Sequence, residues 1–380
     1  MGKDRMTTPS PLFTPFRLGS LTLPNRFVMP AMQRGMCDGG APKPELAEYY
    51  ARRAAGGVPL VIGESAAVDH PSSTVQPTSA HLNAATASAW QACVDAVRRE
   101  GGAMLLQLWH EGALRTDGQA LSPSGKASPK KDSGRAMTRA EMEAIGEGFV
   151  RSAKLAQSIG AAGVEVHAAH GYLLDQFLWH GSNVRDDGYG GPDIADRARF
   201  PAEIVRAIRV ECGPEFVISL RFSQWKEVDY EAKVAADRAE LGTLATMLRE
   251  AGADVLHCST RRFWEREWNG DARNLAGWTK ASGGLPTITV GSVGLDTDVM
   301  TVFMEGRDPG ARVGVAIEDL EKRLEAGEFD LVAVGRALIG DPDFVRKIEA
   351  RDYGAVRTFI RADLGQLEWD TSIVEEAHAG

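Results

Sequence analysis

Two imidazoles and a phenol lie within six residues of one another, at His167, His170 and Tyr172. Neutral histidine and tyrosine side chains donate hydrogen bonds at pH 7, and a phenol can also release a proton. Together the three groups suit a reaction in which a carbonyl oxygen is polarised and a neighbouring carbon is protonated.

Each of these residues also has a structural interpretation, because a single histidine in a strand more often satisfies a local hydrogen bond. The two histidines could instead bind a metal, for which Asp175 is the only nearby carboxylate that follows. A zinc site needs a third protein ligand and usually a position for water, so we expect no metal. The three groups together, followed by a polar loop, favour the catalytic interpretation.

The run from Val164 to Tyr172 has the pattern of a strand that ends in a reactive turn. Val164 and Val166 alternate as in a strand, and residues 161–163 follow an amphipathic helix. His167 therefore falls at the C-terminal end of the predicted strand. Parallel strands of α/β barrels deliver their catalytic groups at that end.

One unit recurs along the chain: an amphipathic helix, a break that contains glycine, and a short apolar strand. Strands are predicted near Val28, Val61, Leu106, Val164, Ile218, Val255, Ile288 and Val332. Eight such units predict a (β/α)8 TIM barrel, preceded by a hairpin over residues 12–24 that turns at Gly19-Ser20. Long loops are predicted after the third, fourth, sixth and seventh strands. A doubly wound sheet is the alternative, but the sequence contains no GxGxxG fingerprint.

Helices are predicted over residues 44–55, 84–100 and 231–251. Another is predicted to begin at the capping-box pattern Thr138-x-x-Glu141, and a further helix is predicted to be broken near Pro201. We assign residues 11–365 to a single TIM-barrel domain, residues 1–10 to a disordered N-terminus and residues 366–380 to a C-terminal tail. The basic stretch from Lys126 to Lys131 lies among serine, proline and glycine, and is interpreted as a solvated loop.

Composition excludes several classes of protein. The formal net charge of −9 argues against nucleic acid as a partner, because a phosphate backbone requires a basic face. Apolar runs are too short to span a bilayer and the first residues lack a secretory signal, so we expect a cytoplasmic protein without a membrane partner. The four cysteines are far apart and form no CxxC pair, which argues against iron–sulfur clusters, zinc clusters and disulfides.

Gly291 and Ser292 follow the seventh predicted strand, and Gly335 and Arg336 follow the eighth. Barrels often bind phosphate with these two loops. Glycine lets backbone N–H groups approach phosphate oxygens, and a guanidinium can bind two of them at once. A glycine after a strand can also simply form a turn.

Three further polar residues, Gln33, Gln107 and Arg221, stand at the ends of otherwise apolar strands. Each could satisfy a structural hydrogen bond at the barrel mouth, but their joint position favours a flat polar ligand across it. An amide both donates and accepts, which matches the edge of an isoalloxazine ring. Arg221 could place positive charge beside the part of that ring that becomes anionic on reduction.

The chain resembles the Old Yellow Enzyme family of FMN-dependent ene-reductases over nearly its whole length. The resemblance is carried by Leu12-Phe13 with Leu23-Pro-Asn-Arg26, Gln107-Leu-Trp109, residues 163–177, Ser182-Asn183-x-Arg185-x-Asp187-x-Tyr189-Gly190-Gly191, Arg197-x-Arg199-Phe200, Leu220-Arg221, and Val334-Gly-Arg336 followed by Asp341-Pro342. The His-x-x-His-Gly-Tyr and Ser-Asn-x-Arg segments are highly specific as a pair.

This resemblance implies that FMN binds noncovalently at the C-terminal face of the barrel. The residues implied to hold it are Pro30, Ala31, Met32, Gln33, Ser65, Gln107, Arg221, Gly291, Ser292, Gly335 and Arg336. NADPH or NADH would reduce the flavin and leave, and an activated alkene would then take the same place, in a ping-pong sequence.

The resemblance also implies roles for the opening motif. His167 and His170 would bind the carbonyl or nitro oxygen of the substrate, so that hydride from flavin N5 reaches the β-carbon, and Tyr172 would protonate the α-carbon. Trp109 would wall the pocket. Alternatively, as in some relatives of the family, the substrate would be an amine, an N-methyl group or a nitrate ester, and a protein that merely retains flavin is a third hypothesis.

Two features depart from the family pattern. Gln33 stands where members often carry Thr or Cys against the flavin carbonyl. The aromatic and charged loop over residues 260–268 matches no general element of the family. It either caps the pocket and sets substrate choice, or is a packed surface loop.

Overall fold

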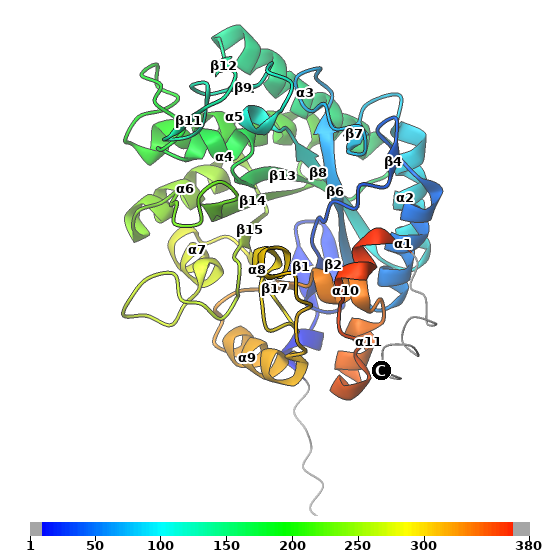
Figure 1. The fold of residues 1–380 in the computed structure, drawn as a ribbon. Coiled ribbons are helices and arrows are strands. Elements are labelled where there is room, and N and C mark those ends of the chain that lie inside the picture. Colours follow the sequence, from blue (N-terminus) through cyan, green and yellow to red (C-terminus); the bar gives the residue numbers. More distant parts are fainter. Residues whose placement is uncertain (1–9, 368–380) are drawn as a thin grey trace, which may run out of the picture.

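The computed structural model describes residues 10–367, and its centre is a closed barrel of parallel strands (Figure 1). In order around the ring, the strands are β3 (Phe27–Met29), β6 (Leu60–Val68), β8 (Ala103–Trp109), β13 (Gly163–His170), β14 (Val217–Lys226), β15 (Val255–Ser259), β16 (Thr287–Val290) and β17 (Leu331–Ala333). Pairing of β17 with β3 closes the ring. The predicted TIM barrel is confirmed.

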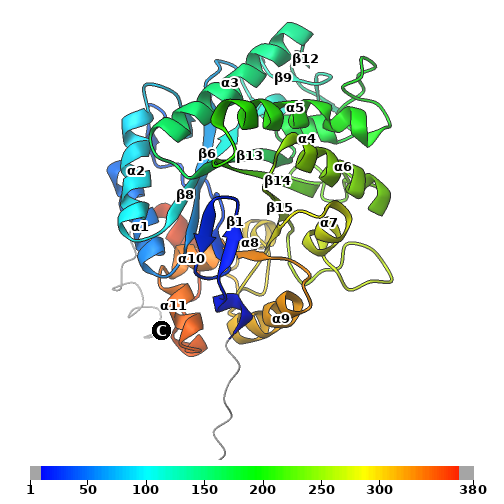
Figure 2. The same cartoon turned by 180° about the vertical axis from the view of Figure 1, so that it is seen from behind.

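Helices surround this barrel on the outside (Figures 1 and 2). The longer ones are α1 (Pro44–Ala55), α2 (Ala87–Arg99), α3 (Arg139–Ser158), α5 (Ile194–Cys212), α6 (Arg238–Ala251), α7 (Leu275–Gly283) and α9 (Val313–Glu325). Shorter helices are α4 (Leu173–Leu178), α8 (Val299–Glu305), α10 (Arg336–Gly340) and α11 (Phe344–Glu349). The capping box predicted at Thr138 begins α3, because its side chain accepts from the Glu141 N–H while the Glu141 carboxylate accepts from the Thr138 N–H.

A hairpin of β1 (Phe16–Leu18) and β2 (Leu21–Leu23) covers the N-terminal end of the barrel, with its turn at Gly19-Ser20 as predicted. Figure 2 shows this hairpin in blue across the barrel. The buried side chains of Leu18 and Leu23 pack in one cluster with Leu60, Val217, Val255 and Leu331, which begin or lie near the start of barrel strands. The opposite, C-terminal end is therefore the one that can hold a site.

Small strands occur in the connecting loops. They are β4 (Cys37–Asp38), β5 (Ala41–Pro42), β7 (Ala80–Leu82), β9 (Leu121–Ser122), β10 (Lys126–Ser128), β11 (Lys131–Asp132) and β12 (Arg135–Ala136). The stretch from Lys126 to Lys131, expected to be a solvated loop, forms a β10–β11 hairpin whose residues 129–131 are exposed. An ion pair of 2.6 Å between Lys126 and Asp132 joins its two strands.

Helix α6 begins at Arg238, so the prediction that it starts near Glu231 is wrong. Its cap Asp237 accepts hydrogen bonds from two N–H groups of the first turn. The preceding backbone bonds to Gln224 of β14, whose Oε1 accepts from the N–H groups of residues 234–235 at 2.8 and 3.0 Å. A distant side chain therefore holds this segment as a loop.

The predicted break near Pro201 is also wrong, because α5 runs through it. A proline inside a helix removes one hydrogen bond and crowds the preceding turn. Here the helix is fixed by Arg197, one turn earlier, whose buried guanidinium donates to the carbonyls of Leu178 and Val234 at 2.8 and 3.0 Å. These tertiary contacts offset the local cost.

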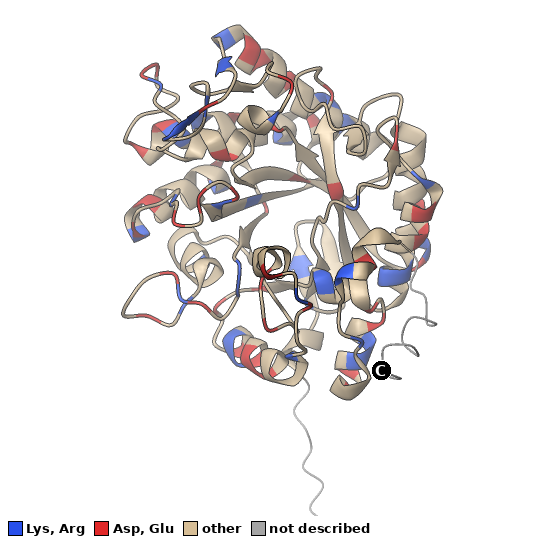
Figure 3. Ribbon diagram, viewed as in Figure 1, with Lys and Arg blue, Asp and Glu red and all other residues tan. Residues whose placement is uncertain are grey.

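The predicted domain, residues 11–365, is described throughout, whereas the segments expected to flank it lie largely outside the described residues. Only residue 10 of the expected disordered N-terminus and residues 366–367 of the expected tail are described. No helix in the described part of the chain is long and apolar enough to cross a bilayer. Figure 3 shows acidic and basic residues interspersed along the outer helices. The four cysteines are buried free thiols.

Leu105→Ala should lower the free energy of unfolding by about 2–5 kcal/mol, because this fully buried side chain fills the barrel interior and its removal leaves a cavity. The matched control is Val210→Ala on α5, where the side chain is 75% exposed, and it should change stability by less than about 0.5 kcal/mol. Urea denaturation followed by circular dichroism measures both, and equal losses would contradict the assigned core.

Candidate active site

A cavity of about 330 Å³ opens at the C-terminal ends of the barrel strands. Its lining includes residues predicted to bind the cofactor, namely Pro30, Ala31, Met32, Gln33, Arg221, Gly291, Ser292, Gly335 and Arg336. His170 lines the same cavity. The fold thus brings residues from both ends of the sequence to one place.

The loops after β16 and β17 have the features that an anion requires. Gly291 has φ +138°, and a Cβ there would lie 2.7 Å from the Thr260 carbonyl oxygen, so glycine is needed. Arg336 Nη2 donates to Ser292 Oγ at 3.2 Å, whereas its buried Nη1 has no acceptor among the described residues. An unpaired buried donor is costly unless a ligand satisfies it, which fits a bound phosphate.

Arg221 places a second buried guanidinium at the cavity. Its Nη1 donates to the Ala31 carbonyl and its Nη2 to Ser259 Oγ, both at 3.2 Å. Its buried Nε finds no acceptor within residues 10–367. The free N–H and the positive charge fit the polar edge of the predicted flavin ring.

Three other predicted cofactor ligands are engaged with protein partners. The Gln107 amide donates to Glu165 Oε1 at 2.8 Å and accepts from Ser65 Oγ at 2.5 Å. Neither Gln107 nor Ser65 is among the residues that line the cavity. Gln33 does line it, and its Nε2 donates to Ser79 Oγ at 2.6 Å.

A buried carboxylate, Glu165, joins four neighbouring strands. It lies on β13 and accepts hydrogen bonds from Gln107 on β8, Ser219 on β14 and His257 Nδ1 on β15, at 2.8, 2.9 and 2.8 Å. Burial alone would raise its pKa, but His257, Arg221 and the hydrogen bonds together lower the pKa to about 2. Sequence reasoning gave this residue no role, although a carboxylate within an apolar strand was a usable signal.

His167, His170 and Tyr172 lie together at the end of β13. The ring centroid of His167 is 5.2 Å from those of both His170 and Tyr172, and the Trp109 ring lies edge-on to Tyr172 at 5.3 Å. His170 has φ +64° and Gly171 has φ +90°. This left-handed turn, unfavourable for a residue with a side chain, returns Tyr172 toward His167.

Both imidazoles are held neutral. Burial first, and then the charge of Arg221, lower the pKa of His167 to about 3 and that of His170 well below its usual value. The Ala169 N–H donates to His167 Nδ1 at 3.3 Å, which places the ring proton on Nε2. His170 Nε2 is 2.8 Å from Ser259 Oγ.

Asp175, considered above as a metal ligand, is instead paired with Lys226 at 2.8 Å, and both side chains are fully buried. Its other oxygen accepts from the Gly171 N–H at 2.6 Å, which fixes the turn before Tyr172. Burial raises the pKa of Asp175 to about 6. Within residues 10–367, no group of three His, Cys, Asp or Glu side chains could hold a metal ion.

Sequence reasoning missed several residues of the cavity, among them Trp225, Glu227, Ser259 and Asp298. The Trp225 ring lies 4.7 Å from that of His170 at 34°, and its Nε1 donates to the Ser259 carbonyl at 3.1 Å. Trp225 and Ser259 were missed because β14 and β15 continue beyond their predicted ends, whereas Glu227 directly follows β14 and Asp298 caps α8. The apolar and aromatic run after Arg221 was the signal for the longer β14.

The loop over residues 260–268 lines the cavity at its start and is packed at its middle. Thr260 and Arg261 line the cavity. Arg261 and Arg262 both pair with the buried carboxylate of Asp298, at 3.0 and 2.7 Å. Phe263 is fully buried in the main hydrophobic core, so the middle of the loop is packed while its start forms cavity wall.

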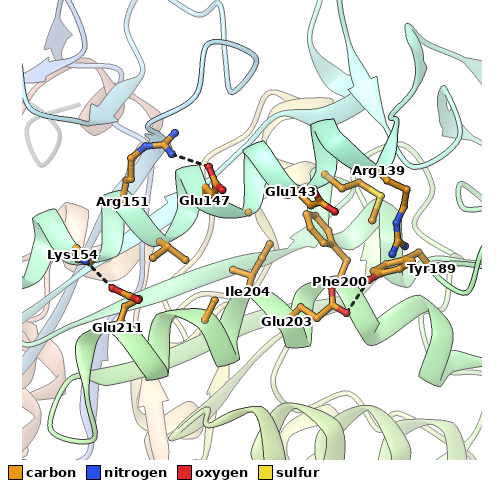
Figure 4. A pocket seen from close by; sticks show the side chains of 14 residues that line it. Arg139, Glu143, Glu147, Arg151, Lys154, Tyr189, Phe200, Glu203, Ile204 and Glu211 are labelled. Atoms are coloured by element: carbon orange, nitrogen blue, oxygen red, sulfur yellow. Dashed lines mark hydrogen bonds and ion pairs between the residues drawn. The ribbon is translucent and has the colours of Figure 1, made fainter.

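A second cavity, of about 660 Å³, lies between α3 and α5 on the outside of the barrel (Figure 4). Charged and polar groups in it pair with one another: Lys154 with Glu211 at 2.7 Å, and the Tyr189 hydroxyl with Glu203 at 2.8 Å. None of the predicted site residues lines it. The unpaired buried guanidinium groups instead point to the barrel mouth as the site.

Stability should fall as the pH is lowered from about 6.5 toward 3. Burial lowers the pKa of His110 and of His167 to about 3, whereas an unfolded histidine binds a proton near pH 6.5. Below that pH the unfolded state binds more protons, so each group removes up to about 1.4 kcal/mol per pH unit. Urea denaturation between about pH 7.5 and 5 measures the slope, which His110→Asn should reduce. Because the raised pKa of Asp175 acts with the opposite sign in this window but equally in both proteins, an unchanged slope in His110→Asn would contradict a buried neutral imidazole at that position.

Comparison with known proteins identifies relatives along most of the chain. A family model described as the NADH:flavin oxidoreductase / NADH oxidase family matches residues 11–353. An NADH oxidase of Thermoanaerobacter brockii is 33% identical over 93% of this chain, which covers 53% of that protein's length. 12-Oxophytodienoate reductase 1 of Oryza sativa subsp. japonica is 31% identical over 89% of this chain and 86% of its own.

A solved structure of morphinone reductase in complex with tetrahydroNAD superposes with a TM-score of 0.77 and 27% identity, covering 96% of this chain and 99% of the other. The predicted likeness to the Old Yellow Enzymes, the FMN cofactor and the nicotinamide reductant are confirmed by these matches. The chain belongs to the NADH:flavin oxidoreductase / NADH oxidase family.

Proposed function

We propose that this protein is an ene-reductase that uses NADH or NADPH to reduce an α,β-unsaturated carbonyl or nitro compound in a ping-pong sequence. The chemistry that bound FMN supplies is hydride transfer, from the nicotinamide to N5 and from N5 to the β-carbon of the alkene. The observation that carries the proposal is the cluster of two neutral imidazoles and a phenol beside the cavity of Arg221 and Arg336. Relatives named for reducing 12-oxophytodienoate and morphinone support a small substrate that bears a ketone.

His167 and His170 bind the oxygen of the substrate and draw electron density from its double bond. Because burial keeps both rings neutral, each presents an N–H donor without bringing an ionised group that would need its own counter-charge. Donors positioned where negative charge develops contribute roughly 3–4 kcal/mol each to the transition state. His170 releases Ser259 or uses its other ring nitrogen for this contact.

Tyr172 donates the proton that the α-carbon receives. Burial raises the pKa of its phenol, so the group stays protonated until the carbon accepts the proton. Trp109 packs against the phenol ring and walls the substrate space. The fixed turn at His170 and Gly171 keeps donor and imidazoles on one side of the substrate.

The remaining site residues hold the cofactor. Arg336, with the glycine-containing loops at residues 291–292 and 335, would bind the phosphate, and the unpaired N–H of Arg221 would serve the polar edge of the flavin. Residues 30–33, which follow β3 and line the cavity, would contact the flavin, and Ser65 on β6 and Gln107 on β8 would do so only by exchanging one of their protein partners.

Tyr172→Phe should slow reoxidation of the reduced flavin by cyclohexenone by roughly 10²–10⁴-fold, because a general acid is lost. Reduction by NADH or NADPH should change less than about twofold, since no proton from Tyr172 is needed there. Anaerobic stopped-flow absorbance of the flavin measures the two half-reactions separately.

Tyr189→Phe is the matched control, because it removes a phenol from the outer cavity of Figure 4 and should leave both half-reactions unchanged. Equal slowing of both half-reactions by Tyr172→Phe would contradict the donor role. A reduced flavin that oxygen reoxidises but no activated alkene does would overturn the proposed function.

Arg336→Lys should weaken FMN binding about tenfold or more, because lysine cannot reproduce the forked contact and hydrogen bonds to charged groups contribute about 1.5–3 kcal/mol. Arg151→Lys, on the exposed side of α3, is the control and should leave affinity unchanged. Titration of apoprotein with FMN, followed by quenching of flavin fluorescence, measures both. Equal affinities for the two variants would place the phosphate elsewhere.

A further inference from the structure

We infer that the Glu227 carboxyl group relays a proton from solvent to Tyr172 during alkene reduction. This inference rests on the proposed role of Tyr172 as proton donor. Glu227 lines the cavity at the barrel mouth, and as a residue it is exposed to solvent. The Tyr172 hydroxyl forms a side-chain hydrogen bond with its carboxylate. The residue therefore reaches solvent, while its largely buried carboxylate is bonded to the donor.

The backbone holds Glu227 in this position. Its N–H donates to the His170 carbonyl at 3.2 Å, immediately before the turn that leads to Tyr172. The adjacent residue, Lys226, is paired with His170 in the register of β13 and β14 and forms the buried ion pair with Asp175. The end of β14 and the catalytic turn are thus fixed to each other on both sides of the proposed relay.

Another carboxylate near the phenol, Glu111, lacks these properties. Glu111 is 1% exposed, and its oxygens accept from the Gln76 amide at 2.6 Å and the Val75 N–H at 3.4 Å. It is buried away from solvent, and both of its oxygens already accept a hydrogen bond from another partner. Glu227 is the carboxylate that can exchange protons with solvent and with Tyr172.

The relay conserves protons and needs no redox partner. Glu227 first takes a proton from water, and its carboxyl O–H then donates to the Tyr172 oxygen, which leaves the phenol O–H free to point at the substrate. When the phenol O–H bond breaks and the α-carbon C–H bond forms, the carboxyl proton passes to the phenolate oxygen. Tyr172 is again a phenol, and Glu227 is a carboxylate that water reprotonates.

The relay predicts a specific pH dependence. Burial raises the pKa of Glu227 above its usual value, although the hydrogen bond from Tyr172 opposes this. Because the protonated form is the active one, alkene-dependent reoxidation should be fast below that pKa and should decline above it. The other charged or titratable groups near this pair are Glu111, Asp175 with Lys226, His170 and Tyr230.

The test is Glu227→Gln, which keeps the size of the side chain but cannot shuttle protons. In the FMN-loaded enzyme, reoxidation by cyclohexenone should slow about tenfold, less than for loss of the donor itself, because water still reaches the phenolate. Reduction by NADH or NADPH should stay within about twofold. The decline of reoxidation with rising pH should disappear in the variant, a change that a purely structural role would not produce.

The matched control is Glu231→Gln, which makes the same change in the same exposed loop and should alter neither half-reaction. In the Tyr172→Phe background, Glu227→Gln should cause no further slowing, since the relay acts only through Tyr172. If Tyr172→Phe slows reoxidation but Glu227→Gln behaves like Glu231→Gln, or keeps the pH decline, the relay is wrong and the proposed function stands. If Tyr172→Phe itself has no effect on reoxidation, the donor role and the relay fall together.

Discussion

The catalytic end of this barrel depends on one buried negative charge, that of Glu165. Arg221 lies within the protein, and an uncompensated buried guanidinium would cost several kcal/mol. Glu165 supplies the counter-charge from the neighbouring strand and is itself satisfied by three hydrogen bonds. Arg221 in turn helps to lower the pKa values of His167 and His170. One carboxylate therefore permits the cation that, together with burial, keeps both imidazoles neutral.

A second constraint is the turn that carries the three catalytic candidates. Its left-handed residue, His170, is conformationally unfavourable, and the structure offsets this with the Lys226–Asp175 pair and the hydrogen bond from Gly171. Such a buried pair is sensitive to loss of either partner, because the remaining charge would be stranded. The same few contacts between β13 and β14 therefore stabilise the fold and fix the geometry of the site.

The fold could be predicted from the sequence because each strand and helix carries its own periodicity, and the strand ends then place His167, Arg221 and Arg336 at one face. The lengths of the helices and strands could not be predicted, because they depend on contacts with side chains that are distant in the sequence. The Gln224 amide holds residues 234–235 outside α6, and Arg197 anchors α5 through its proline. Such contacts leave no local pattern in the sequence.

In the candidate site, too, local sequence predicts some features, and others depend on distant contacts. Residues next to glycine or at the end of an apolar strand could be identified, whereas Trp225 and Ser259 lie on extensions of strands that local sequence did not mark. Gln107 was identified by position, yet its amide is bound to Glu165 and Ser65 rather than facing the cavity. Which way a polar side chain turns depends on partners from other strands.

The N-terminal hairpin packs Leu18 and Leu23 against the starts of the barrel strands and so closes one end of the cylinder. Small molecules therefore reach the barrel from the opposite end, where the cavity of about 330 Å³ opens. Under the proposed ping-pong sequence, the reductant and the oxidant would exclude each other from this one cavity, and each would act as a competitive inhibitor of the other. Turnover is then expected to be fastest at balanced concentrations and to slow with an excess of either compound.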